Sequence, residues 1–136
     1  MVSKSKKMAG FTLLELLVVV AIISLLAAIA IMQFSKYKAQ AYDTAARSDL
    51  KNAMTTLENF FIDNNDYPTD KDGLLTNGLN LSEDVCFTKY DKETFNGGQP
   101  TVHMHVKHAG SSNAWHAKYP EEGSEIEIRT GGGSCL

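Results

Sequence analysis

The chain has 136 residues, 43% of them hydrophobic, and a formal net charge of −3 at pH 7. This length is typical of a single domain, and the acidic balance argues against a basic surface for nucleic acid. The two cysteines do not form a Cys-x-x-Cys redox motif, and no Ser–His–Asp set or glycine-rich phosphate loop can be read in the chain. We therefore expect neither an enzyme nor a bound cofactor.

The N-terminal region joins a basic segment to a long apolar one. Lys6 and Lys7 precede Gly10, and residues 11–31 contain a single ionisable side chain, that of Glu15. The apolar run is long enough to span a bilayer as a helix. An ionisable residue inside such a run is costly to insert and therefore marks a functional position. The lysines before the run indicate a cytoplasmic leader by the positive-inside rule.

Cleavage after Gly10 would supply a partner for Glu15. It would make Phe11 the new N-terminus and create an α-amine, the only cation that this segment can offer. If subunits stack with an offset of one helical turn, the amine of one subunit reaches the carboxylate of the next. A buried pair of this kind specifies geometry more than it adds stability. The alternative is an uncleaved signal anchor whose Glu15 side chain extends to the membrane interface.

The junction resembles the class III signal of type IV pilins and pseudopilins over residues 10–15 (GFTLLE) and the apolar residues 16–23. The resemblance implies that a membrane-embedded prepilin peptidase cuts after Gly10 and methylates Phe11, and that Glu15 is the assembly residue. It also implies four kinds of partner: other copies of the chain, the peptidase, an assembly platform with its ATPase, and the membrane before assembly.

The helix is expected to continue well beyond the apolar run. Many members of the family have a glycine and a helix breaker where this chain has Ser24 and Met32, so we expect a continuous or only partly loosened helix there. No Pro or Gly occurs from Gln33 to Asn64, and apolar residues recur on one helical face. These residues are Leu50, Ala53, Met54, Leu57, Phe60 and Phe61. The acids of this half are interpreted as its solvated or intersubunit face, namely Asp43, Asp49 and Glu58.

The remaining chain predicts a small antiparallel sheet. Alternating or apolar segments occur at residues 85–89, 101–107, 114–119 and 125–129, separated by turn-forming residues. A sheet with one buried face, laid on the amphipathic half of the helix, gives an α+β fold. An even cysteine count outside the cytoplasm favours a disulfide between Cys86 and Cys135.

The predicted organisation has four parts. They are a leader at 1–10, a transmembrane and assembly helix at 11–32, an amphipathic helical half at 33–66 and a globular β head at 67–136, in which residues 67–84 form a connecting loop.

Two groups of polar residues are candidate metal ligands. His103 and His105 lie on one face of a predicted strand, with His108 and His116 nearby in sequence. Because no carboxylate stands at ligand spacing, a solvated face is preferred to a metal site. Residues 64–73 offer oxygen ligands but lack the spacing of an EF-hand, so no metal is assigned and calcium stays open.

We therefore expect a structural subunit of a type IV pilus, held in the cytoplasmic membrane by one span and then polymerised into a cell-surface filament. The alternative is a pseudopilin of a type II secretion system that forms a short periplasmic pseudopilus. The disulfide favours the pilin. Residues 67–74 resemble the loop of major pseudopilins and favour the alternative. The role of the filament in motility, adhesion, DNA uptake or electron transfer is not specified by these residues.

Overall fold

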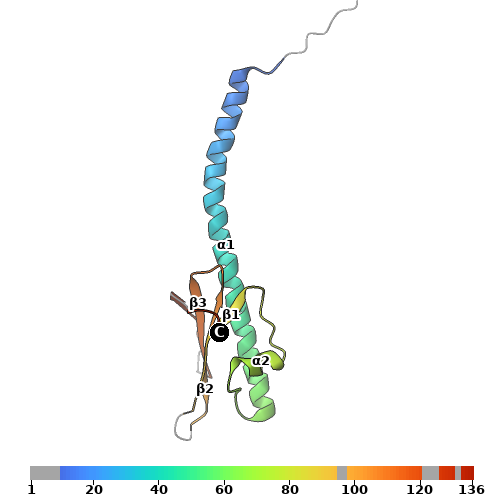
Figure 1. Cartoon of the computed structure of the whole chain (residues 1–136), viewed down its shortest axis with the longest axis vertical. Helices are drawn as coiled ribbons and strands as arrows, with labels where there is room; N and C mark the ends of the chain where they lie inside the picture. Colours follow the sequence, from blue (N-terminus) through green and yellow to red (C-terminus); the bar gives the residue numbers. More distant parts are fainter. Residues whose placement is uncertain (1–9, 95–97, 121–125, 131–132) are drawn as a thin grey trace, which may run out of the picture. The chain divides into compact units, whose positions relative to one another are not determined.

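The computed structural model describes residues 10–94, 98–120, 126–130 and 133–136. The chain divides into two units, Met1–Tyr37 and Lys38–Leu136, which are described separately below. The elements in chain order are α1 (Leu13–Asn64), α2 (Lys71–Thr76), β1 (Val85–Glu93), β2 (Thr101–His108), β3 (Asn113–Tyr119) and β4 (Glu127–Thr130) (Figure 1). The α+β class predicted from the sequence is confirmed.

In the first unit, α1 runs without a break through Ser24 and Met32, as the absence of Gly and Pro predicts. The Ser24 hydroxyl donates to the Val20 carbonyl, 2.7 Å away, one turn earlier in the helix. The apolar side chains of this part are exposed on every side of the helix, from 49% at Val18 to 81% at Leu13. This part of α1 therefore has no core of its own within the chain.

In the second unit, α1 buries one face. Its buried residues are Ala46, Asp49, Leu50, Ala53 and Leu57, a spacing that follows the helical period. The helix ends at Asn64 because Asn65 adopts the left-handed conformation at φ 55°, and its N–H donates to the Phe61 carbonyl at 2.7 Å.

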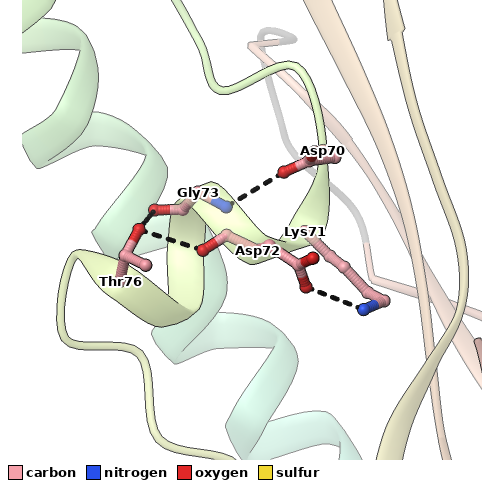
Figure 2. A network of polar contacts seen from close by, with 5 residues as sticks. All are labelled: Asp70, Lys71, Asp72, Gly73 and Thr76. Carbon is pink, nitrogen blue, oxygen red and sulfur yellow. Dashed lines mark hydrogen bonds and ion pairs between the residues drawn. The ribbon is translucent and has the colours of Figure 1, made fainter.

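The segment predicted as a connecting loop contains the short helix α2. The Asp70 carboxylate accepts from the Gly73 N–H at 3.1 Å and caps the first turn (Figure 2). The helix ends at Thr76, and two residues later Gly78 has a φ of 92°, which suits a residue without a β-carbon. The next residue, Leu79, donates its N–H to the Leu74 carbonyl, and both leucines join the core. This closing motif fixes α2 against the rest of the head.

The four strands form one antiparallel sheet in the order β1-β2-β3-β4. Val102, Met104 and Val106 alternate on the buried face of β2, and Met104 stands opposite Ala117 of β3. The alternation predicted for β2 and β3 is confirmed. β1 runs to Glu93, beyond its predicted end at residue 89, because it pairs along all of β2. The predicted start of the last strand, at residue 125, lies outside the described residues.

A single core joins the buried face of α1 to the sheet and the connecting segment. The fully buried large side chains at its centre are Phe87, Leu50, Leu57, Leu74, Met104, Val102 and Val106. They come from α1, α2, β1 and β2, so the amphipathic half of the helix is covered as predicted.

Asp49 lies inside this core, and its interpretation as part of a solvated or intersubunit face was wrong. It is only 3% exposed. Its carboxylate accepts from the backbone N–H of Ser82 at 2.6 Å and from the Ser82 hydroxyl at 3.1 Å. A buried carboxylate requires such partners, and here they come from the segment that leads into β1.

The other two acids of the amphipathic half of α1, Asp43 and Glu58, form hydrogen bonds to residues of the head. Asp43 is half-buried and accepts from the Ser111 hydroxyl and from the Asn113 side-chain amide, the latter at 2.8 Å. Glu58 is exposed, and its carboxylate accepts from the Tyr119 hydroxyl. Together they link α1 to both ends of β3.

The predicted disulfide is confirmed. Cys86 of β1 is bonded to Cys135, with their Cα atoms 5.6 Å apart and a sequence separation of 49 residues. Beside it, the Leu136 N–H donates to the Phe87 carbonyl at 2.9 Å. The disulfide and this hydrogen bond therefore hold Cys135 and Leu136 against β1.

Candidate functional site

The first turn of α1 holds the residue singled out by the sequence, Glu15. Thr12 immediately precedes the helix, and its N–H and hydroxyl both donate to the Glu15 carboxylate, at 2.8 and 2.9 Å. The Glu15 N–H donates in return to the Thr12 hydroxyl at 3.2 Å. This reciprocal arrangement is a capping box. Sequence reasoning missed it, although the pattern Thr-x-x-Glu at the start of an apolar helical run is its usual signature.

Gly10 and Phe11 lie outside the helix, just before this box. Both are exposed, Phe11 to 85%. A peptide bond in non-helical, exposed backbone can be reached by a protease, whereas one inside a helix cannot without unwinding. If the bond after Gly10 is cut, the new amine stands one residue from Thr12, whose N–H already contacts Glu15. Residues 1–9, most of the predicted leader at 1–10, lie outside the described residues.

The apolar part of α1 meets the requirements of a membrane span by length and composition, and its most hydrophobic window is 0% buried in the chain. Exposed leucine, isoleucine and valine side chains surround the helix rather than forming a stripe. A helix that is apolar on all sides needs lipid or other helices around it. This surface and the capping box at its start form the candidate functional site.

The outer face of the sheet carries three histidines from two strands. His105 of β2 stands opposite His116 of β3, and the Nδ1 atom of His103 lies 3.4 Å from the Nε2 atom of His116. Burial, together with the neighbouring His116, Lys89, Arg129 and His103, lowers the pKa of His105 to about 4. Burial also lowers the pKa of His116. The three imidazoles are half-buried rather than solvated as expected, and the rings of His105 and His116 are neutral at neutral pH.

His108, which the sequence placed near this group, belongs to the other face of β2. It is buried and stacks on Tyr42 with the ring centroids 3.9 Å apart. Its Nδ1 atom accepts from the Gly110 N–H at 2.9 Å. Its environment indicates a packed structural histidine.

Three carboxylates among residues 64–73, the segment considered for calcium, are engaged by protein groups. The Asp70 carboxylate caps α2, and Asp72 forms an ion pair with Lys71 at 2.8 Å (Figure 2). Asp66 pairs with Lys92 at 2.7 Å, and this contact holds the pKa of Asp66 below its ordinary value. Among the described residues, no group of three His, Cys, Asp or Glu side chains lies close enough together to hold a metal ion.

Comparisons of the chain with known proteins identify its family. Residues 5–31 match the family model described as the prokaryotic N-terminal methylation motif. The chain is 33% identical over 115 residues to the "Type IV wide pilus major component PilA4" of Thermus thermophilus, which covers 84% of this chain and 83% of that protein. The chain belongs to the type IV pilin and pseudopilin family.

Two further relatives show how wide this pilin family is. The chain is 47% identical over 58 residues to the "Type IV major pilin protein PilA" of Myxococcus xanthus, covering 43% of this chain and 26% of that protein. It is 38% identical over 69 residues to the "Type II secretion system core protein G" of Pseudomonas aeruginosa, covering 51% of this chain and 49% of that protein. The family therefore includes both pilus and secretion subunits similar to this one.

Proposed function

We propose that this pilin-family chain is the structural subunit of a type IV pilus. The observation that carries the proposal is the surface of α1 between Leu13 and Ile31, which is apolar on all sides and uncovered within the chain. A membrane can cover that surface, and so can the stems of neighbouring subunits. Similarity over 84% of the chain to a pilus major component supports a filament-forming subunit.

Processing is the first step of the proposed mechanism. The peptidase removes residues 1–10 by cutting after Gly10 and methylates the amine of Phe11. The exposure of Gly10 and Phe11 outside α1, and the match of residues 5–31 to the methylation-motif family, support this step. Until assembly, the chain stays in the cytoplasmic membrane through the single span at 11–32.

Assembly is the second step. The Phe11 amine of one subunit pairs with the Glu15 carboxylate of its neighbour and sets the axial register of the stems. Glu15 already has a fixed position in the isolated chain because Thr12 holds its carboxylate by two hydrogen bonds. A carboxylate so oriented loses little side-chain freedom when the amine arrives. The assembly platform and its ATPase extract the subunit from the lipid. In the filament, the stems form the inner layer, the amphipathic half at 33–66 connects each stem to its head, and the heads at 67–136 form the outer layer at the cell surface.

The second candidate is a pseudopilin of a type II secretion system. The similarity to core protein G of Pseudomonas aeruginosa favours it, although that match covers half of each chain. The proposed processing and stem packing are the same in both cases. What differs is whether the polymer reaches the cell surface.

Electron microscopy and mass spectrometry of sheared surface material distinguish the two functions. We expect long filaments whose subunit begins at a methylated Phe11, and their loss in a Gly10→Val variant that blocks cleavage. A matched Ala28→Val variant, altered on an exposed position of α1, should still be cleaved. If the mature chain occurs only in the cell envelope and its deletion stops protein secretion, the pseudopilin function replaces the proposed one.

A further inference from the structure

The outer face of the sheet brings two imidazole nitrogens to the separation of metal ligands. His103 and His116 lie on adjacent strands, diagonally across the β2–β3 register, and their rings are inclined by 26°. The distance between His103 Nδ1 and His116 Nε2 is 3.4 Å. Zinc bound tetrahedrally with Zn–N distances of 2.0–2.1 Å separates its ligand nitrogens by about 3.3–3.4 Å. The two side chains therefore already have the nitrogen spacing that such an ion needs.

The other ring nitrogens suit this role. The Nε2 atom of His103 faces the Glu93 carboxylate at 3.7 Å, which places an acid behind the ring as metal-binding histidines commonly have. The Nδ1 atom of His116 is buried and has no hydrogen-bond partner in the described part of the chain. With its proton on that nitrogen, the Nε2 atom of His116 keeps a lone pair that faces His103 Nδ1 and that an ion between the two rings can use.

Only small motions separate this arrangement from a chelate. The histidine χ2 torsion has a broad energy well, so rotation of each ring can turn both lone pairs toward one point. His105 packs against His116 at 67° between the ring planes and is not required as a ligand. Two protein nitrogens with water in the remaining positions make an open site. This site is consistent with the absence of any three-ligand cluster among the described side chains.

We propose that His103 Nδ1 and His116 Nε2 bind one zinc ion on the outer face of the head. The ion bridges β2 and β3, and its remaining ligands are water molecules or a group from outside the chain. Imidazole prefers zinc to hard cations such as Mg²⁺, which bind oxygen. The proposal does not depend on whether the chain builds a pilus or a pseudopilus.

Calorimetric titration of the full chain in detergent micelles tests the site. We expect one Zn²⁺ per chain, no heat of binding with Mg²⁺, and an affinity at least fivefold lower in both His103→Gln and His116→Gln. The control Lys107→Gln changes a residue on the same outer face of β2 and should bind Zn²⁺ within twofold of the wild type. Equal binding of Mg²⁺ and Zn²⁺, or a loss below fivefold in either histidine variant, overturns the proposal.

A second measurement needs no variant and keeps the proposal testable if a substitution prevents folding. In the wild-type chain, Zn²⁺ should shift the ring nitrogen resonances of His103 and His116, and EDTA should reverse the shifts. Since an ion that binds only the folded state raises its stability, the melting temperature should also rise with Zn²⁺ concentration. Shifts confined to other histidines, or a melting temperature that Zn²⁺ leaves unchanged, contradict the assignment.

Discussion

Replacing Asp49 by Ala removes a carboxylate that the core has enclosed. The side chain is 3% exposed and accepts two hydrogen bonds from Ser82, at 2.6 and 3.1 Å. A hydrogen bond to a charged group contributes about 1.5–3 kcal/mol. Because Ser82 is itself exposed, water can take up part of the loss. We expect the free energy of unfolding of the head to fall by about 2–4 kcal/mol.

Urea unfolding of the full chain in detergent micelles, followed by the fluorescence of the buried Trp115, measures this change. Asp49→Asn keeps one acceptor oxygen and should lose about half as much stability as Asp49→Ala. The matched control is Asp63→Ala, an exposed acid on the same helix, which should stay within about 0.5 kcal/mol of the wild type. A loss below about 1 kcal/mol for Asp49→Ala would refute the view that this carboxylate anchors α1 to the segment before β1.

Three other changes test different parts of the molecule. In Gly110→Ala the new β-carbon would lie 2.5 Å from the Tyr42 ring, so the free energy of unfolding, measured by thermal melting, should fall by about 1–3 kcal/mol. An unchanged melting temperature would contradict this contact. Cys86→Ser removes the disulfide that closes a loop of 49 residues and should lower the free energy of unfolding by about 4 kcal/mol in the chain-entropy model. If the wild-type chain melts identically with and without reductant, the disulfide does not have this stabilising effect. Glu15→Gln keeps an acceptor for the capping box but removes the charge, whereas Thr12→Ala keeps the charge and removes the hydroxyl contacts of the box. Filament yield, measured by immunoblot of sheared material, should fall at least tenfold only in Glu15→Gln, and an equal fall in both would assign the effect to the cap.

The regular elements could be predicted because their residues repeat with the period of the structure. Leu50, Ala53 and Leu57 recur at helical spacing, and Val102 and Met104 alternate as a half-buried strand requires. Each pattern is local, so the sequence alone carries it. The disulfide could be predicted for a different reason, because two cysteines allow only one pairing.

Contacts between distant segments could not be predicted in the same way. Asp49 looked like a solvated acid because its partner Ser82 lies 33 residues away, and no local pattern joins the two. The approach of His103 to His116 depends on the register of β2 and β3, which is set by the whole sheet. The capping box of Thr12 is a different case, because its pattern was present in the sequence but was not used.

The central claim is that Glu15 of one subunit meets the Phe11 amine of the next. A cryo-electron microscopy reconstruction of the assembled filament measures this directly. The account predicts the amine nitrogen within about 4 Å of a Glu15 carboxylate oxygen from a neighbouring subunit, with both groups inside the packed stems. A filament in which Glu15 faces solvent, or lies near no amine of any subunit, would contradict it.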